Sequence, residues 1–428
     1  MAANANSKTL NPEGANRFRR APIAGLLATL VAATLVACGG GGGSSAGVGT
    51  GGTGSFAVGT VSGFGSVIVN GVRYDDSSAS VLDDDDNASN TGALSIGQVV
   101  EIRGSVDSDG LNGTATRIAY FSELKGPVTA VDAGAGTVTV FGQVVNVTAT
   151  TVFENASGLG ALAVGNVVEV YGLPDGTGAV TATRIEREAV SIAAYGGEFR
   201  VRGVVSDLVA TSPGQRFSLG SVVVQTDGST EVKDGPIVNG VFVKVRLNKT
   251  AAGDGSYTAV RVKVKELKYE DGVTKAEVQG LVSEFTSLTA PFKVNGYPVQ
   301  LDISVTYEDG AAGDLANDVR IEAKGVVTGG VLVISKVEFD HEDNDGGDDG
   351  DSAPFEFHGV ATCSATPCGS PAGAIVVRGE TVQYDASTQF SSGVTADNLN
   401  GAKIEVKAVA QSGSNGTTLL ATRIELDN

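Results

Sequence analysis

Ala182-Thr183-Arg184-Ile185-Glu186 returns unchanged as Ala421-Thr422-Arg423-Ile424-Glu425. A looser copy is Ala115-Thr116-Arg117-Ile118, and weaker copies occupy 259–262 and 333–338. Each copy alternates apolar and polar residues, which predicts a β-strand with one buried face. Each copy also closes a longer unit of similar layout. The sequence therefore indicates one small β module used five times.

Five glycines open these units at similar intervals. They are Gly59, Gly126, Gly203, Gly280 and Gly359, which are 67, 77, 77 and 79 residues apart. A period this long indicates an array of domains, because solenoid units span only about 20–50 residues. Each unit has room for about five or six strands. A sheet that small protects its edges by closing, so we expect OB-like β-barrels, with a small sandwich as the alternative.

The expected fold is all-β, and the composition agrees with it. Glycine is abundant (60 residues) and tryptophan is absent, which suits short strands joined by tight turns. The expected segments are a lipoprotein signal peptide at 1–37, a glycine-rich tether at 38–55, β modules at 56–122, 123–197, 198–271 and 272–340, an acidic linker at 341–352, and a fifth β module at 353–428.

The N-terminal segment has the features of an export signal. A basic cluster at 17–20 precedes an apolar run at 23–37 that has the length of a signal-peptide core. The run ends in Leu35-Val36-Ala37-Cys38, which resembles the bacterial lipobox. That resemblance implies lipidation of Cys38, and Gly39 in place of Asp implies the outer membrane of a Gram-negative bacterium. An ordinary secretory signal is the alternative. A flexible tether and several acyl chains would hold the protein on a membrane surface.

The chain is strongly acidic, with a formal net charge of −19. Removing 1–37 removes four basic residues and one acidic residue, which leaves 26 basic and 48 acidic side chains and a net charge of −22. Such a field repels DNA and RNA, so we expect no nucleic-acid partner, although it does not exclude a local basic patch. The simplest interpretation is that the net negative charge keeps the protein soluble.

The order of short motifs resembles a bacterial domain of unknown function, family 5666. The motifs are G-x-V, V-N-G, G-x-x-V-E-V-x-G and A-T-R-I-E, and they recur across nearly all of the expected mature chain. Module three departs from them at Lys244, where the other copies have Glu. Module four has Arg320-Ile321-Glu322 and no clear A-T-R. The resemblance implies tandem domains in a secreted protein or lipoprotein, and it implies no activity.

Catalytic patterns are not evident in the sequence. The two histidines, His341 and His358, accompany no repeated Ser/His/Asp arrangement and no G-x-S-x-G motif. The motif glycines open strands, with no following helix to form a phosphate loop. Nothing marks a pair among the 49 acidic residues as a catalytic pair. We therefore expect a protein that is not an enzyme.

Cys363 and Cys368 lie five residues apart, with Pro367 between them. An envelope location is oxidising, so we expect a local disulfide that acts as a structural staple. A metal site built on this pair would need two more ligands, and His358 supplies only one. A redox role for the pair has no support in the sequence.

An acidic run joins the fourth and fifth modules. Its carboxylates at Asp343, Asp345, Asp348, Asp349 and Asp351 alternate with glycines, an arrangement that can wrap Ca²⁺. The full twelve-residue calcium loop with its terminal Glu is missing. A solvated, self-repelling linker is the alternative. Apart from weak Ca²⁺ binding, we expect no cofactor.

The recurring Arg and Glu of the closing strands are interpreted as exposed cross-strand pairs, with Ile filling the barrel. The expected role is therefore binding or interaction through repeated barrel surfaces, where weak contacts add by multivalency. A structural spacer without a ligand and an enzyme with an unrecognised carboxylate site are the alternatives. The expected partners are a membrane, through the lipid anchor, and a glycan or an envelope protein. The sequence predicts no oligomeric state.

Overall fold

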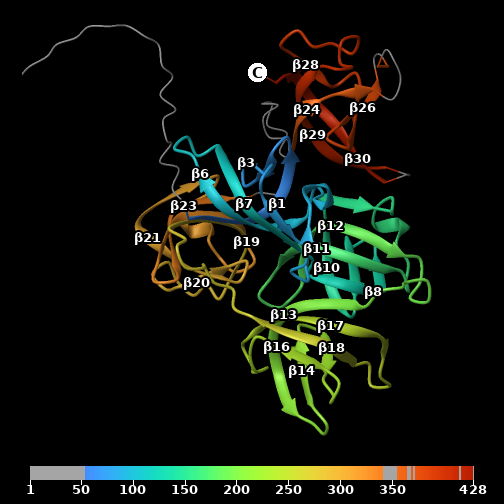
Figure 1. Cartoon of the computed structure of the whole chain (residues 1–428), viewed down its shortest axis with the longest axis vertical. Helices are drawn as coiled ribbons and strands as arrows, with labels where there is room; N and C mark the ends of the chain where they lie inside the picture. The colour runs from blue at the N-terminus through green and yellow to red at the C-terminus, as the bar shows by residue number, and fades with distance from the viewer. Residues whose placement is uncertain (1–53, 341–353, 364–367, 370–371, 414–415, 428) are drawn as a thin grey trace, which may run out of the picture. The chain divides into compact units, whose positions relative to one another are not determined.

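The computed structural model describes residues 54–340, 354–363, 368–369, 372–413 and 416–427 (Figure 1). Nearly all of its secondary structure is β-strand, which confirms the all-β prediction, and short 3₁₀ turns lie at Thr91–Ala93, Leu159–Ala161 and Ala312–Asp314. Among the described residues, no helix has the length and apolarity needed to cross a membrane. Cys38 and the proposed calcium ligands of the acidic run lie outside the described residues.

Module 2 shows the barrel most clearly. Its strands are β8 (Leu124–Asp132), β9 (Thr137–Val140), β10 (Gln143–Glu154), β11 (Val167–Pro174) and β12 (Val180–Ala189). The pairings run β8–β9–β10–β12–β11 and return from β11 to β8, so the sheet is closed. The third and fifth strands are parallel and the other pairs are antiparallel. This is a five-stranded OB-like barrel, as the sequence predicted.

Modules 1 and 3 repeat the same closed order. Module 1 consists of β1 (Ser55–Phe64), β2 (Val67–Val69), β3 (Val72–Asp75), β6 (Val99–Val106) and β7 (Asn112–Phe121), with a hairpin of β4 (Ser80–Leu82) and β5 (Ala88–Ser89) between its third and fourth barrel strands. Module 3 consists of β13 (Phe199–Ala210), β14 (Gln215–Leu219), β15 (Val222–Gln225), β17 (Phe242–Ala251) and β18 (Tyr257–Lys265), with β16 (Glu231–Lys233) beside β18.

Modules 4 and 5 complete the set. Module 4 consists of β19 (Lys275–Ser283), β20 (Phe292–Val294), β21 (Tyr297–Glu308), β22 (Arg320–Thr328) and β23 (Val331–Phe339). Module 5 consists of β24 (Phe355–Val360), β25 (Thr362–Cys363), β26 (Gly373–Val377), β27 (Glu380–Tyr384), β28 (Gln389–Phe390), β29 (Lys403–Gly413) and β30 (Gly416–Leu426).

Local sequence explains the turns and the side chains that fill the interior of each barrel. Asn70 and Gly71 both have positive φ, 52° and 70°, and they connect β2 to β3 as a hairpin. Asn and Gly tolerate this region with little strain, which is why the pair suits a tight turn. Ile185 and Ile424 of the repeated closing strand are fully buried. The repeated isoleucine therefore fills the barrel, as expected.

Strand pairing also links the modules to one another. β1 of module 1 runs parallel to β19 of module 4 and, further along, parallel to β24 of module 5. β8 of module 2 pairs antiparallel with β13 of module 3. The buried apolar side chains follow the same grouping, because one cluster joins modules 1 and 5 and another joins modules 2 and 3.

The interpretation of the Arg and Glu pairs as exposed is wrong for module 2. Arg184 is 6% exposed, and its Nη1 donates to the Ile96 carbonyl of module 1 at 3.1 Å. Arg184 also contacts Glu154 and Glu186. The matching Arg423 of module 5 pairs with Glu425 at 2.8 Å and stays partly exposed. The same motif therefore serves as a partly exposed pair in one module and as a buried link between modules in another.

Candidate functional site

Each barrel has an outer face made of its first, fourth and fifth strands, and one row of paired residues crosses that face. In module 2 the row is Lys125, Glu169 and Glu186. The matching rows are Val58, Glu101 and Ala119 in module 1, Arg202, Lys244 and Lys263 in module 3, Gln279, Glu322 and Glu338 in module 4, and His358, Glu405 and Glu425 in module 5. Four rows contain a glutamate in the middle strand, and the row of module 3 contains only cations.

The next row of module 3 has the same character. Arg200 pairs with Arg246, and Arg246 pairs with Arg261. The corresponding rows are Glu277, Lys324 and Lys336 in module 4 and Glu356, Lys407 and Arg423 in module 5, so both mix acid and base. We call the six residues of module 3 the cationic face: Arg200, Arg202, Lys244, Arg246, Arg261 and Lys263.

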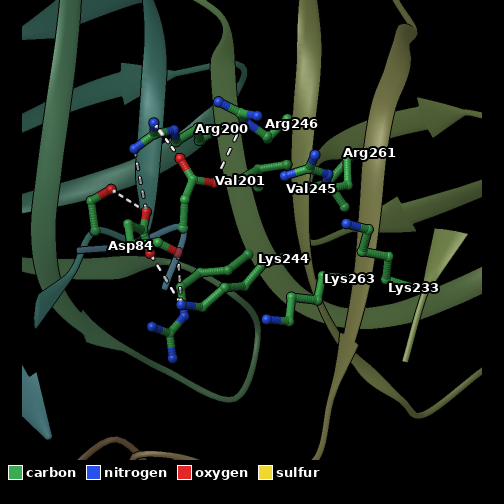
Figure 2. A pocket seen from close by; sticks show the side chains of 12 residues that line it. Asp84, Arg200, Val201, Lys233, Lys244, Val245, Arg246, Arg261 and Lys263 are labelled. Carbon is green, nitrogen blue, oxygen red and sulfur yellow. Dashed lines mark hydrogen bonds and ion pairs between the residues drawn. The ribbon is translucent and has the colours of Figure 1, made fainter. Parts of the chain in front are cut away.

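Strand alternation aims these six side chains outward. Val201, Val245 and Val262 lie between them in sequence, and they are buried in the barrel. The cationic face lines a cavity of about 100 Å³, and Lys233 of β16 also lines it (Figure 2). Side chains of like charge packed this closely repel one another unless anions lie among them. The site therefore needs carboxylates or another anion.

An acidic loop of module 1 supplies several of these carboxylates. The loop is the tip of the β4–β5 hairpin, Asp83 to Asp86. The Asp84 carboxylate lies 3.2 Å from Lys244 Nζ, and the Asp85 carboxylate lies 2.7 Å from Arg200 Nη2 (Figure 2). Asp86 pairs with Lys263, and its other oxygen is 3.5 Å from Lys265. Three successive carboxylates of the β4–β5 hairpin thus pair with cations of module 3, which begins more than 100 residues later.

Burial and neighbouring charges shift the pKa values of Asp86 and Lys265. Burial opposes ionisation of Asp86, but hydrogen bonding from Lys263 and the nearby lysines hold its pKa below the usual value. Burial lowers the pKa of Lys265, and the charge of Lys244 lowers it further. Lys265 is thus close enough to Lys244 to be repelled by it, although Asp86 also lies beside Lys265. Burial and the neighbouring cation thus both disfavour the charged form of Lys265.

Arg202 is the most enclosed member of the cationic face. Its side chain is 7% exposed and lies between the rings of Phe121 and Phe242, at 3.9 and 4.8 Å from the ring centroids. The Glu123 carboxylate is 3.4 Å from Arg202 Nε, and burial raises the pKa of Glu123 to about 7. Arg202 Nη1 is buried and has no hydrogen-bond partner among the described residues. A buried guanidinium N–H of this kind can donate a hydrogen bond to an anionic oxygen.

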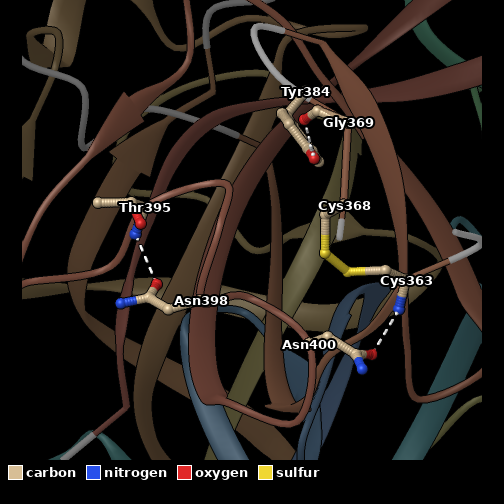
Figure 3. Close-up of a disulfide and its surroundings, with 7 residues drawn as sticks. All are labelled: Cys363, Cys368, Gly369, Tyr384, Thr395, Asn398 and Asn400. Atoms are coloured by element: carbon tan, nitrogen blue, oxygen red, sulfur yellow. Dashed lines mark hydrogen bonds between the residues drawn. A yellow bond between two sulfur atoms is a disulfide. The ribbon is translucent and has the colours of Figure 1, made fainter. Parts of the chain in front are cut away.

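The pair Cys363 and Cys368 is joined as a disulfide, with Cα atoms 5.4 Å apart (Figure 3). The backbone N–H of Cys363 donates to the Asn400 side chain at 3.1 Å, and the Tyr384 hydroxyl donates to the Gly369 carbonyl at 2.6 Å. The bridge and these contacts tie Cys368 and Gly369 to the barrel of module 5. No metal is needed to account for this pair.

Sequence reasoning did not identify the cationic face as a site. It noted Lys244 only as a departure from the repeated motif, and it assigned no role to Asp83–Asp86. The available signal was the coincidence of six cations at alternating positions of three strands in one copy of an acidic repeat. Comparing the five copies position by position would have found it.

Comparisons with known proteins concern the repeat. The model of a family described as "Domain of unknown function (DUF5666)" matches residues 57–119, 125–186, 202–263, 279–338 and 369–425. No curated protein matches the chain. A solved structure titled "drosophila Unr CSD456" is 12% identical and covers 53% of this chain and 96% of that chain, with a TM-score of 0.14. A TM-score this low carries no argument about this chain.

Proposed function

The chain belongs to the family described as domain of unknown function DUF5666, and on that premise we propose that it is a non-enzymatic binding protein whose cationic face takes an anionic ligand. The observation that carries the proposal is the cationic face itself. Six cations occupy two adjacent rows of one module in a chain whose formal net charge is −19. Charge this concentrated attracts anionic groups, and carboxylates of the same chain already pair with each of the six cations, so a ligand would have to compete with them.

The acidic loop defines the chemistry of that partner. Its carboxylates follow one another through a tight turn, which the Asp86 N–H closes by donating to the Asp83 carbonyl at 2.9 Å, and they meet neighbouring cations of the face. A ligand that replaces the loop must also carry several closely spaced anionic groups. The proposed ligand is therefore an anionic glycan of the cell envelope. The net negative charge of the protein disfavours long nucleic acids, which are repelled beyond the contact area.

Competition between loop and ligand follows from this arrangement. The loop is tethered to module 1, so its effective concentration at the cationic face is high. A free anion must bind more strongly than the loop, or must bind first at Arg202 and Arg261, which the loop does not contact and which lie beside Glu123 and Glu231. Binding should weaken steeply with salt, because both the loop and the ligand act through charge.

The proposed location is the cell envelope, with the protein anchored through lipid on Cys38. The motif around Cys38 and the glycine-rich tether support this placement. Mass spectrometry of the N-terminal peptide from the membrane fraction tests it. Acyl chains on Cys38 are expected, and Cys38→Ala should move the protein to the soluble fraction. An unmodified Cys38 in the mature protein would contradict the anchor.

A titration of the full-length chain with polygalacturonate tests the binding proposal. We expect saturable binding that Arg246→Gln and Arg261→Gln each weaken at least about tenfold, since a charge-assisted contact contributes about 1.5–3 kcal/mol. Lys293→Gln is the matched control, because Lys293 lies in an exposed pair with Glu284 on module 4. Equal affinity in all four proteins would refute a role for the cationic face.

A structural spacer is the second candidate, and the strand pairing between modules favours it. β1 joins two other modules and β8 joins β13, so these barrels share sheets. A spacer would use the loop and the cationic face only to lock modules 1 and 3 together. It predicts no saturable anion binding, and it predicts that loss of the loop contacts lowers stability without changing any affinity.

A further inference from the structure

A second cluster of ionisable side chains lies on module 5, away from the cationic face. His358 of β24 pairs directly with Glu405 of β29, and Glu356 lies two residues before His358 on the same side of the strand. One ligand atom from each of these three side chains lies within 4.8 Å of the others. The set combines an imidazole with two carboxylates, so it is not merely an acidic patch.

The imidazole of His358 is held in a defined orientation. Its side chain is 6% exposed, Nε2 lies 2.5 Å from Glu356 Oε1, and Nδ1 lies 3.3 Å from Asp427 Oδ1. Metal-binding histidines commonly direct their second ring nitrogen to a carboxylate, which fixes the tautomer and leaves the first nitrogen to bind the ion. The Asp427 carboxylate is near enough to Nδ1 to take that supporting position. The other nitrogen, Nε2, faces Glu356.

We propose that Glu356, His358 and Glu405 bind one divalent transition-metal ion, with Asp427 as the positioning residue for the imidazole. One imidazole nitrogen and two carboxylate oxygens form a ligand set that suits Zn²⁺, which takes nitrogen and oxygen ligands at about 2.0–2.2 Å. Hard cations such as Ca²⁺ prefer all-oxygen sets, so the imidazole favours zinc over calcium.

Arg73 of module 1 pairs with the same glutamates, so metal binding would affect the contact between modules 1 and 5. Its Nη2 lies 2.5 Å from Glu356 Oε1 and 3.9 Å from Glu405 Oε2, so the guanidinium competes for the same carboxylates. A metal ion with two positive charges can replace it. The link from module 1 to Glu356 is then lost, and the contact between modules 1 and 5 loosens. Removing the competitor with Arg73→Gln should therefore tighten metal binding.

The repeat also predicts the stoichiometry. The position of His358 is held by Val58, Lys125, Arg202 and Gln279 in the other four modules. None of these side chains is a zinc ligand, and Lys125 and Arg202 bring a cation to the same place. One ion per chain is therefore expected from this cluster, although the fold is repeated five times.

Isothermal titration of the full-length chain with Zn²⁺ tests the proposal, and Co²⁺ absorption reports the ligand set. We expect a single site that is weakened at least about tenfold by His358→Ala and by Glu405→Gln, and about 10–100-fold by Asp427→Asn. The Co²⁺ spectrum should change in Asp427→Asn, which a purely structural role for Asp427 would not require. The control is His341→Ala, because His341 is the other histidine of the chain.

Unchanged affinity in His358→Ala and Glu405→Gln would overturn the proposal, and so would loss of binding in His341→Ala. Glu405→Gln keeps a side chain of the same size, so it guards against misfolding of the histidine variant. Binding of more than one ion with equal affinity would contradict the single site. None of these outcomes depends on whether the cationic face binds a glycan.

Discussion

Lys244 Nζ lies 3.2 Å from the Asp84 carboxylate and 3.1 Å from the Asp84 carbonyl oxygen, although 160 residues separate them. Lys244 stands where the other four modules have a glutamate. A glutamate there would face the acidic loop and repel it. The reversal of one repeated charge therefore accompanies the docking of module 1 on module 3.

Restoring the repeated residue should separate these two modules. Lys244→Glu places a carboxylate beside Asp84 in a largely buried setting, where both side chains are under 20% exposed. We expect a loss of about 3 kcal/mol in the free energy of unfolding, the usual cost of leaving a buried charge without its partner. Urea denaturation measures it. Lys293→Glu, in an exposed pair, should cost under about 1 kcal/mol. Equal losses in the two variants would argue against the docking.

The repeated closing strand allows a comparison within one chain. Arg184 is buried between modules 1 and 2, whereas Arg423 occupies the same motif position at a partly exposed site. Arg184→Ala should lower the unfolding free energy by about 3 kcal/mol, because it leaves Glu186 without its cation. Arg423→Ala should lower it by about 1 kcal/mol or less. Thermal or urea unfolding of the two variants tests this order, and the reverse order would be incompatible with it.

Two buried glutamates should make stability depend on pH. Burial raises the pKa of Glu123 and of Glu169 to about 7, from 4.5. The folded protein then binds more protons than the unfolded chain between these values, so stability is full below pH 4.5 and falls as pH rises to about 7. Glu123→Gln should flatten this decline by on the order of 2 kcal/mol. Unfolding curves at pH 5, 6 and 7 measure it, and an unaltered slope would show that Glu123 ionises normally.

Glu356 should act in the opposite direction. Hydrogen bonding from His358, with the charge of Arg73, lowers its pKa to about 2. Its contribution to stability is present above pH 4.5 and is lost as pH falls toward 2. Glu356→Gln should therefore reduce stability at pH 6 by about 1 kcal/mol, after allowance for partial exposure, and by less at pH 3. The same loss at both pH values would contradict an ionised Glu356.

The disulfide should stabilise module 5 by a modest amount. Closing the short loop between Cys363 and Cys368 contributes about 2 kcal/mol in the chain-entropy model. Reduction should therefore lower the unfolding temperature of the chain, and Cys363→Ala/Cys368→Ala should reproduce the effect. Reducing agent should then change nothing further in the double variant. A large residual effect in that variant would point to another reducible group.

Much of the fold could be predicted because the repeat encodes it locally. Alternation in the closing strand predicts one buried face, and Ile185 and Ile424 are buried as expected. The Asn70-Gly71 step predicts a hairpin because both residues tolerate positive φ, and the turn is there. The recurrence of the alternating strand pattern in five copies indicated small closed barrels.

The candidate sites could not be predicted in the same way, because they depend on contacts between distant modules. Nothing local to Asp84 indicates that Lys244 lies beside it, and nothing local to Arg184 indicates the Ile96 carbonyl. Similarly, His358 joins Glu405 only through strand pairing within module 5. Position-by-position comparison of the copies would have marked Lys244 and His358 as exceptions, but not their partners.

The most direct test of the account is binding of polygalacturonate to a chain whose acidic loop is neutralised. Asp84→Asn, Asp85→Asn and Asp86→Asn together remove the charges that compete for the cationic face. If this face is a ligand site, the triple variant should bind at least about tenfold more tightly than the natural chain, and the gain should shrink between about 50 and 200 mM salt. Unchanged or weaker binding by a folded triple variant would contradict the account and favour a spacer.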